Sequence, residues 1–340
     1  MYDDEDLNAA VSAGVMPAEI AAAFRRFMAE RHQTATPDDE RFRLVSGFND
    51  VFVTIAIGLV LISVSQLSGS EDSMVAGLLI AGLSWVLAEY FSKRRRMALP
   101  SLVLLLTFCL GLSMASLTVV DPFAAHNPPA ATAKAVAIAL AVAGGTYLHW
   151  RRFKIPAAIA GIALFVLAAV YSLVTLVLGA AVLEHWTWVM LAGGIAIFAL
   201  AMHWDASDRT RQTRRSDVAF WLHMAAAPMI AHPLFSLLGL LNANPSKAWE
   251  AGAAVTLYVA MTLVAIAIDR RAMLVSALAY VLGALIALLQ AGSSGGEAFA
   301  IIGLVVGAAL LLLSSLWQRA RRKVLALLPP SWQAKLPPAE

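Results

Sequence analysis

Long apolar segments separated by short polar loops dominate this sequence from about residue 48 onward. A helix that crosses a membrane needs roughly 20 mostly apolar residues to span about 30 Å of hydrocarbon. The separations near residues 150–155 and 268–272 are short, but each carries basic residues that would be costly at mid-membrane. We therefore place a tight turn at both. The pattern predicts ten spanning helices, at 48–67, 74–92, 98–120, 131–150, 155–179, 186–204, 217–241, 249–268, 272–291 and 298–318.

The distribution of basic residues indicates how these spans are oriented. Of the 25 Lys and Arg residues, all but Lys134 and Lys247 lie before the first predicted span, after the last, or in every second loop. Cytoplasmic loops of membrane proteins are enriched in Lys and Arg. Trp150, Trp204 and Trp317 fall at the predicted cytoplasmic ends, which is typical of interfacial anchors. We therefore predict a bacterial inner-membrane protein with both termini in the cytoplasm.

Composition supports a polytopic membrane helix bundle of the all-α class. Hydrophobic residues make up 60% of the 340-residue chain, charged residues 14%, and the mean hydropathy is +0.74. An average soluble domain is about 25% charged. The pI near 9.1 does not indicate nucleic-acid binding, because the membrane topology already accounts for the basic clusters. Cys109 is the single cysteine, which excludes an intramolecular disulfide and a CxxC motif.

The acidic N-terminus, MYDDEDLNAA, lacks the basic and apolar regions of a secretory signal peptide. We therefore expect the first span to direct membrane insertion. The chain divides into three predicted parts: a cytoplasmic helical hairpin and linker at 1–44, the ten-span bundle at 45–318, and a basic juxtamembrane cytoplasmic tail at 319–340.

The N-terminal hairpin is too small to bury a core of its own. We predict short helices at residues 4–13 and 17–32, the second of which carries one apolar stripe. We expect this stripe to pack on the membrane surface, on the bundle or on a partner protein. Its residues are Ile20, Phe24, Phe27 and Met28.

A parallel internal repeat of spans 1–4 and 7–10 is possible. FNDVFVTIAIGLVLI in the first span is similar to RSDVAFWLHMAAAPMI in the seventh, and RRRMALPSLVLLL is similar to DRRAMLVSALAYV six spans later. Many transporters are built from repeats, with substrate sites at the repeat interface. Chance similarity between apolar sequences is the alternative.

The seventh span carries most of the candidate chemistry. It contains His223, Pro228, His232 and Pro233, and Asp217 opens it. Ionisable residues inside membranes often mark functional sites, and prolines bend helices and free carbonyl groups. These residues therefore predict a kinked gating helix that lines a polar path. The alternative is structural, because a neutral histidine can hydrogen-bond between helices and proline is common in membrane helices.

Among the carboxylates, Asp50 and Glu89 are further candidates for a polar path. Asp50 opens the first span, where a carboxylate also complements the helix dipole. Glu89 lies four residues before Lys93, which also permits an ion pair within one helix. We favour these structural roles. We likewise interpret Asp269 and its neighbour Arg270 as an interfacial ion pair.

No metal site, cofactor site or catalytic motif is expected. His223 and His232 are nine residues apart and point to opposite faces of a straight helix. His149 and His203 are interpreted as residues of the interfacial belt. HExxH, P-loop, GxGxxG and GxSxG motifs are absent from the sequence. Gly303 and Gly307 form a GxxxG pair that predicts a close helix contact.

The layout resembles uncharacterised families of bacterial multi-pass membrane proteins. These have a short N-terminal helical region, here LNAAVSAGVMPAEIAAAFRRFMAERH, followed by many spans. They carry no established activity, so the resemblance implies a fold and a location but no function. The size and topology also resemble the drug/metabolite transporter class. That class has inverted five-span halves, whereas the repeat in this sequence is parallel.

Three functional hypotheses follow. The first is a secondary transporter or permease for a small solute, with the seventh span as the moving element. The second is a scaffold, assembly factor or sensor that docks a cytoplasmic protein through the N-terminal hairpin. The scarcity of charge at mid-membrane favours this second hypothesis. The third is a membrane enzyme or redox protein that uses the histidines. The expected partners are the lipid bilayer, a solute or a cytoplasmic protein, and the oligomeric state stays open.

Overall fold

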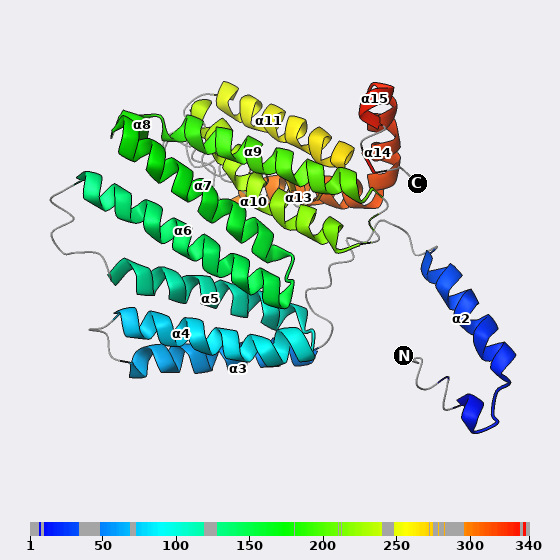
Figure 1. Ribbon diagram of the computed structural model, residues 1–340. Helices are drawn as coiled ribbons and strands as arrows, with labels where there is room; N and C mark the ends of the chain where they lie inside the picture. Colours follow the sequence, from blue (N-terminus) through cyan, green and yellow to red (C-terminus); the bar gives the residue numbers. More distant parts are fainter. Residues whose placement is uncertain are drawn as a thin grey trace. The chain divides into compact units, whose positions relative to one another are not determined.

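A computed structural model describes residues 7, 10–33, 48–68, 73–118, 128–179, 181–209, 211, 213–239, 248–271, 273–274, 278, 282, 296–333 and 336–337. Every regular element in these ranges is a helix (Figure 1). The chain separates into two compact units, Met1–Phe42 and Arg43–Glu340, called unit 1 and unit 2. Each unit is described by itself.

Unit 1 contains helix α2, Ala18–Gln33, close to the predicted 17–32. Gly14 lies before it with φ at 70°, a left-handed conformation that glycine adopts without a steric penalty. The carbonyl of Pro17 accepts hydrogen bonds from the N–H groups of Ile20 and Ala21. Proline suits this position because its missing N–H would have no helical partner there.

Unit 2 is built from long apolar helices joined by short connections. Neighbours in the sequence form antiparallel hairpins, and α4 packs on α5, α6 on α7 and α9 on α10 (Figure 1). The elements are α3 (Phe48–Leu67), α4 (Ser73–Ala88) with its π-helical extension η1 (Glu89–Arg94), α5 (Ala98–Thr118), α6 (Pro128–Phe153), α7 (Ala157–Leu178), α8 (Ala181–Glu184), α9 (Trp186–Ser207), α10 (Arg214–Leu237), α11 (Ala248–Ile268), α13 (Gly296–Ser315), α14 (Trp317–Ala326) and α15 (Pro330–Gln333).

Seven helices of the described chain are long and apolar enough to cross a membrane: α3, α4 with η1, α5, α6, α7, α9 and α10. They fit an integral membrane protein and agree with the first seven predicted spans. Helices α11 and α13 coincide with the eighth and tenth predicted spans and contain shorter apolar stretches, Gly252–Ile268 and Val306–Ser315. The ninth span, 272–291, falls almost entirely outside the described residues, so the total of ten stays a prediction.

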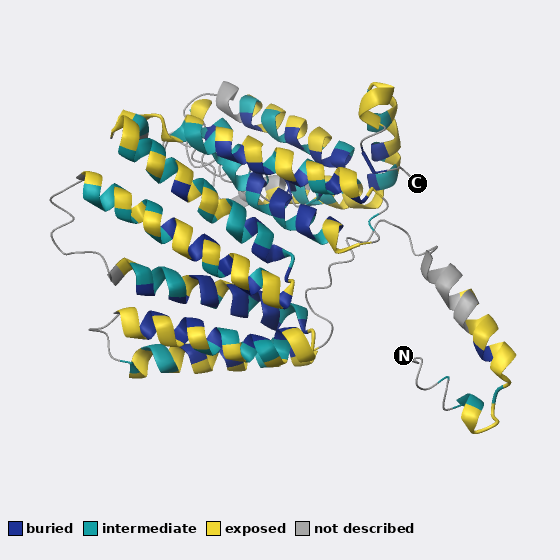
Figure 2. Ribbon diagram, viewed as in Figure 1, coloured by how far each residue is buried: buried dark blue, intermediate teal, exposed yellow. Residues whose placement is uncertain are grey.

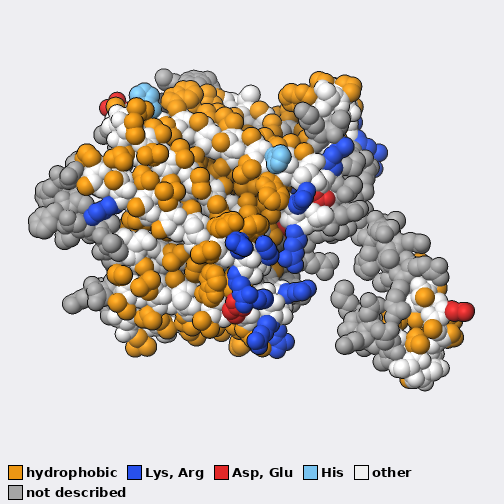
Figure 3. Space-filling model, viewed as in Figure 1, with side chains coloured by type: hydrophobic (Ala, Val, Ile, Leu, Met, Phe, Trp, Pro, Cys, Tyr) orange, Lys and Arg blue, Asp and Glu red, His pale blue; other side chains and the backbone are white. Residues whose placement is uncertain are grey.

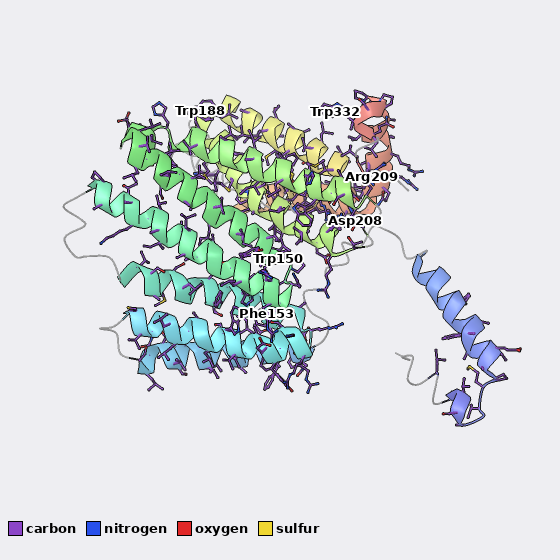
Figure 4. The ribbon with its side chains drawn as sticks, viewed as in Figure 1. Trp150, Phe153, Trp188, Asp208, Arg209 and Trp332 are labelled. Atoms are coloured by element: carbon purple, nitrogen blue, oxygen red, sulfur yellow. The ribbon has the colours of Figure 1, made fainter. Side chains whose placement is uncertain are left out.

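The four basic connections between these helices share one backbone feature. Each contains a non-glycine residue in the left-handed region: Arg96, Lys154, Arg211 and Asp269, with φ between 53° and 58°. A left-handed residue ends a helix and reverses the chain within a few residues. The four turns lie at the same end of unit 2, which we call the basic end (Figure 1). Figure 4 places Trp150, Phe153, Asp208 and Arg209 at this end and Trp188 at the opposite end.

Glycines allow backbone contact between α4 and α5. A Cβ atom on Gly77 would lie 2.6 Å from the carbonyl oxygen of Gly111, and one on Gly111 would lie 2.6 Å from the carbonyl oxygen of Gly77. Ala81 and Ala115 continue the contact one turn further along each helix. Small residues four apart let two membrane helices approach until their backbones touch.

The outer faces of the helices are exposed (Figure 2), and they carry large apolar side chains. Leu106 is 66% exposed and Leu311 74% exposed, as expected for surfaces that contact lipid. Helices α10 and α5 are more buried, because 56% and 50% of their apolar windows lie inside the fold, against 6% for α7. One side of α10 packs on α7 and α9, and its other side packs on α11 and α14. It is therefore the central helix of the C-terminal half of unit 2.

Candidate functional site

A buried cluster of charged side chains lies at the basic end, where α9, α10, α11 and α14 meet. Its centre is Asp205, near the end of α9 and 2% exposed. The Nε2 atom of His223, on α10, lies 2.9 Å from Oδ2 of Asp205. Arg270, in the turn after α11, donates from Nε to the same oxygen at 3.2 Å and from a terminal nitrogen to Oδ1. That nitrogen also donates to the backbone carbonyl and the hydroxyl of Ser216, both at 3.1 Å.

A second carboxylate, Asp269, completes the cluster from the same turn. Trp317 at the start of α14 donates from its indole Nε1–H to Oδ1 of Asp269 at 2.7 Å. Arg211, in the α9–α10 loop, donates to Oδ2 at 2.8 Å, and Arg321 lies 3.6 Å from that oxygen. Arg211 also donates to the backbone carbonyl of Asp269 at 2.9 Å. The short turn after α11 therefore joins the α9–α10 loop to α14.

Backbone carbonyls of the C-terminal tail accept hydrogen bonds from the guanidinium groups of two arginines. Arg209 donates from Nε to the carbonyl of Leu336 at 3.1 Å, and Arg321 donates to the carbonyl of Pro337 at 2.5 Å. Leu336 is itself part of the apolar core that contains Trp317. The tail therefore packs against the cluster and covers it from one side.

The start of α10 is held by its own loop. Asp208 accepts hydrogen bonds from the N–H of Thr213 at 2.9 Å and from its hydroxyl at 2.7 Å. The Thr213 hydroxyl in turn caps α10 by accepting from the N–H of Arg215. These bonds fix the first turn of α10, and they thereby set the position of Ser216 and His223 relative to Asp205.

The cluster is stable only as a set, because buried charges are costly unless each is paired. Arg270 and Arg321 are each 1% exposed and His223 is fully buried, so water cannot replace a lost partner. The Nδ1 atom of His223 has no hydrogen-bond partner among the described residues. The other ring nitrogen, Nε2, faces the Asp205 carboxylate.

Trp317→Phe tests the link between the turn and α14. The change keeps an aromatic ring beneath Arg271, whose guanidinium carbon lies 5.0 Å from the ring centroid, but it removes the indole donor to Asp269. A hydrogen bond to a charged group contributes about 1.5–3 kcal/mol, and we expect a loss of that size in the free energy of unfolding. Denaturation in mixed micelles with dodecyl sulfate measures it.

Trp332→Phe is the matched control, because Trp332 is 64% exposed (Figure 4). We expect the control to change the free energy of unfolding by no more than about 0.5 kcal/mol. Equal losses in the two variants would show that the bond to Asp269 does not stabilise this end of the fold.

Further along α10, Pro233 affects the contact with α9. Pro233 has no N–H, so the carbonyl of Met229 lacks its usual helical donor. A Cβ atom on Gly194 of α9 would lie 2.9 Å from this carbonyl oxygen. Gly194 therefore makes room for the freed carbonyl. Pro233 is buried and Pro228 is partly buried.

The structure brings together only some of the predicted site residues. His223 belongs to the cluster, whereas His232 is partly buried on α10 nine residues further along. Asp217 is partly buried in the first turn of α10. Asp50 is 3% exposed in the first turn of α3, and its backbone carbonyl accepts from the Thr54 hydroxyl at 2.7 Å. The polar path along α10 therefore stays a prediction.

Glu89 has a stronger partner than the one predicted. Lys93 lies 3.9 Å from its carboxylate, but Arg152 on α6 makes two hydrogen bonds to it, at 2.5 and 2.9 Å. The pair joins the ends of η1 and α6, and sequence spacing within one helix could not indicate it. The closeness of α6 to η1 is decided by the packing of α5 between α4 and α6.

Three expectations from the sequence were wrong. Asp269 and Arg270 bind different partners, because the left-handed backbone of the turn sends the two side chains apart. Trp317 is not an interfacial anchor, since it is 2% exposed and hydrogen-bonded within the cluster. His149 is not a belt residue either. It is fully buried among Trp85, Phe108 and Phe153, and neither ring nitrogen has a described hydrogen-bond partner.

Two other predictions, on the GxxxG pair and on metal binding, are not tested by the described residues. No described atom lies within 4 Å of a Cβ built on Gly303 or Gly307, so their close contact stays a prediction. Within the described residues, no group of three or more His, Cys, Asp or Glu side chains could hold a metal ion. Cys109 is buried, and its Sγ lies 3.2 Å from the Thr146 hydroxyl.

Sequence reasoning missed Asp205, Arg211 and Arg321, and it gave Arg270 the wrong partner. The sequence could have indicated these residues, because it places carboxylates within otherwise basic turns. A carboxylate in such a turn has guanidinium groups within reach. The cluster can hold four chain segments together through polar contacts, which can be exchanged for contacts with water or solute.

Comparisons with protein-family models, with curated proteins and with solved structures find no match to this chain.

Proposed function

We propose that this protein is a secondary transporter or permease for a small solute. The basic end is its cytoplasmic side, and both termini are on that side of a bacterial inner membrane. The charged cluster around Asp205 and Asp269 is the closed gate on that side. The observation that carries the proposal is the buried, hydrogen-bonded Asp205–His223–Arg270 group at the end of a proline-containing helix.

Two features of α10 support a moving role. The middle of its buried face carries small side chains, with Ala226, Ala227 and Ala231 fully buried between Leu222 and Phe235, so few large side chains interlock with neighbouring helices there. Pro228 and Pro233 interrupt its hydrogen-bond ladder, and interrupted helices are where transporters bind solutes. Closure by ion pairs is reversible because each partner can be hydrated when the helices separate.

Accessibility of single cysteines on α10 tests this proposal without knowledge of the solute. Cys109→Ser removes the native thiol, and Ala227→Cys or Ala231→Cys introduces one on the packed face. We expect a membrane-impermeant thiol reagent to label these cysteines from the side opposite the basic end. With Asp205→Asn and Arg270→Gln added, we expect labelling from the basic end, because the gate then lacks the buried ion pair between α9 and the turn after α11.

Two further cysteines calibrate the experiment. Arg215→Cys is exposed at the basic end and is labelled from that side in every background. Val166→Cys stays unlabelled, because Val166 is 43% exposed on the outer face of α7, where its side chain faces lipid. If the α10 cysteines are labelled from neither side in either background, the helix is permanently packed and transport is excluded as the function.

The second candidate is a scaffold or sensor, and an observation on unit 1 favours it. Ile20 and Phe27 are each 55% exposed and Phe24 is 37% exposed, on one face of α2. Such a stripe fits a cytoplasmic protein partner. Photo-crosslinking from positions 24 and 27 in native membranes would then give a discrete protein adduct. The same probe at Glu19 would give none, and adducts with lipid alone would contradict this candidate.

A further inference from the structure

Seven exposed basic side chains gather on the first two turns of the basic end (Figure 3). They lie in η1, in the turn to α5, at the end of α6 and in the turn to α7. We call them the α4–α6 patch: Lys93, Arg94, Arg95, Arg96, Arg151, Arg152 and Lys154.

The patch is held in place by three local contacts. The bidentate bond between Arg152 and Glu89 ties the end of α6 to η1. The guanidinium of Arg95 donates to the Tyr90 hydroxyl at 3.1 and 3.2 Å. The Nζ atom of Lys154 lies 4.4 Å above the ring centroid of Trp150. Aromatic rings and one carboxylate therefore keep the cations close together despite their mutual repulsion.

Most of this positive charge is not neutralised within the described part of the chain. Glu89 is the carboxylate that pairs with the patch, and Arg94, Arg96 and Arg151 have no acceptor there. The turns after α9 and α11 are different, because Asp269 and Asp205 bind Arg211 and Arg270 in the interior, while Arg214 and Arg215 stay exposed. The first two basic turns thus differ from the later two, because no buried carboxylate binds their guanidinium groups within the described residues.

The surface next to the patch is apolar. On α4 and α6, within two turns of it, Val86 is 64% exposed, Tyr147 45% and Leu148 57%. In an integral membrane protein such faces contact acyl chains. A cationic headgroup site beside an acyl-chain surface fits a phospholipid, whereas a free phosphate ion would use only the cations.

We propose that the α4–α6 patch binds the phosphate group of an anionic phospholipid, whose acyl chains lie along the exposed flanks of α4 and α6. Guanidinium groups bind phosphate oxygens in pairs, and each basic side chain near an anionic lipid surface strengthens binding by roughly fivefold. This lipid site does not depend on the transport activity proposed above.

Lipid titration of the full-length protein in a neutral detergent tests the proposal. The thermal unfolding midpoint is followed against dioleoyl phosphatidylglycerol, against dioleoyl phosphatidylcholine and against glycerol phosphate. We expect a saturable rise with phosphatidylglycerol alone. Removing two cations, in Arg94→Gln with Arg151→Gln, should weaken its apparent affinity about 25-fold. Arg214→Gln with Arg215→Gln, two exposed arginines before the charged cluster, should leave the affinity within about twofold of the unmodified protein.

Each other outcome contradicts the proposal. An equal rise with phosphatidylcholine would mean that the charge of the headgroup is not recognised. A rise with glycerol phosphate would identify a free phosphate site instead of a lipid site. Equal weakening in both double variants would indicate general attraction to the basic end and not the α4–α6 patch. If the first double variant unfolds before lipid is added, Arg94→Gln alone replaces it, with an expected weakening of roughly fivefold.

Discussion

Replacing Asp205 by Asn destabilises the protein by about 3–5 kcal/mol, because the change leaves the buried guanidinium of Arg270 without its counter-charge. Arg270 is 1% exposed, and its other acceptors are the neutral oxygens of Ser216. His223 loses its carboxylate partner at the same time. The free energy of unfolding in mixed micelles measures the effect, and a fall in the yield of monodisperse protein accompanies it.

A double variant separates lost pairing from lost packing. Asp205→Asn with Arg270→Gln removes both charges, and we expect it to recover at least half of the stability lost by Asp205→Asn alone. Arg215→Gln, at an exposed arginine of α10, serves as the control and should stay within about 0.5 kcal/mol of the unmodified protein. If the double variant is less stable than the single one, the two charges do not act as a pair.

Gly77→Ala and Gly82→Ala, two changes of the same kind in the same helix, should alter stability in opposite directions. A Cβ on Gly77 would lie 2.5 Å from the backbone nitrogen of Ala115 and 2.6 Å from the carbonyl oxygen of Gly111, so α4 and α5 would have to separate. We expect a loss of about 1–3 kcal/mol or more. A Cβ on Gly82 meets nothing described within 4 Å, so alanine there gains about 0.5–1 kcal/mol from its higher helix propensity.

The same measurement, unfolding in mixed micelles, compares the two variants. Gly111→Ala provides an independent check, because its Cβ would lie 2.6 Å from the carbonyl oxygen of Gly77 across the same contact. We expect Gly111→Ala to lose as much as Gly77→Ala. A neutral Gly77→Ala variant would mean that α4 and α5 are not in backbone contact within the membrane.

The two halves of unit 2 use their basic turns in different ways. In the first half, Glu89 and Arg152 form one exposed pair and the remaining cations face outward. In the second half, Asp205 and Asp269 draw Arg211, Arg270 and Arg321 into the interior. This difference gives the first half a surface for anionic ligands and gives the second half a polar lock between helices.

Much of the fold could be read from the sequence. Hydropathy located the seven described spans and placed the helices at 248–268 and 296–315, because every segment that crosses a bilayer must satisfy its own backbone and present an apolar surface. The basic turns were also recognisable, since Lys and Arg are excluded from the apolar segments. The selection of His223 on the seventh span followed from the same rule, because an ionisable group at depth needs a partner.

The sequence by itself therefore determined which segments are apolar helices and which residues are excluded from them. Both follow from the free energy of transferring each side chain into hydrocarbon. The tertiary structure alone decided which charges meet. Asp205 and Arg270 are far apart in the chain, and Asp269 turns away from its neighbour Arg270 because the backbone there is left-handed. Gly77, Gly111 and Gly194 form close backbone contacts whose partners the sequence did not indicate, because only packing determines which face of a helix meets another.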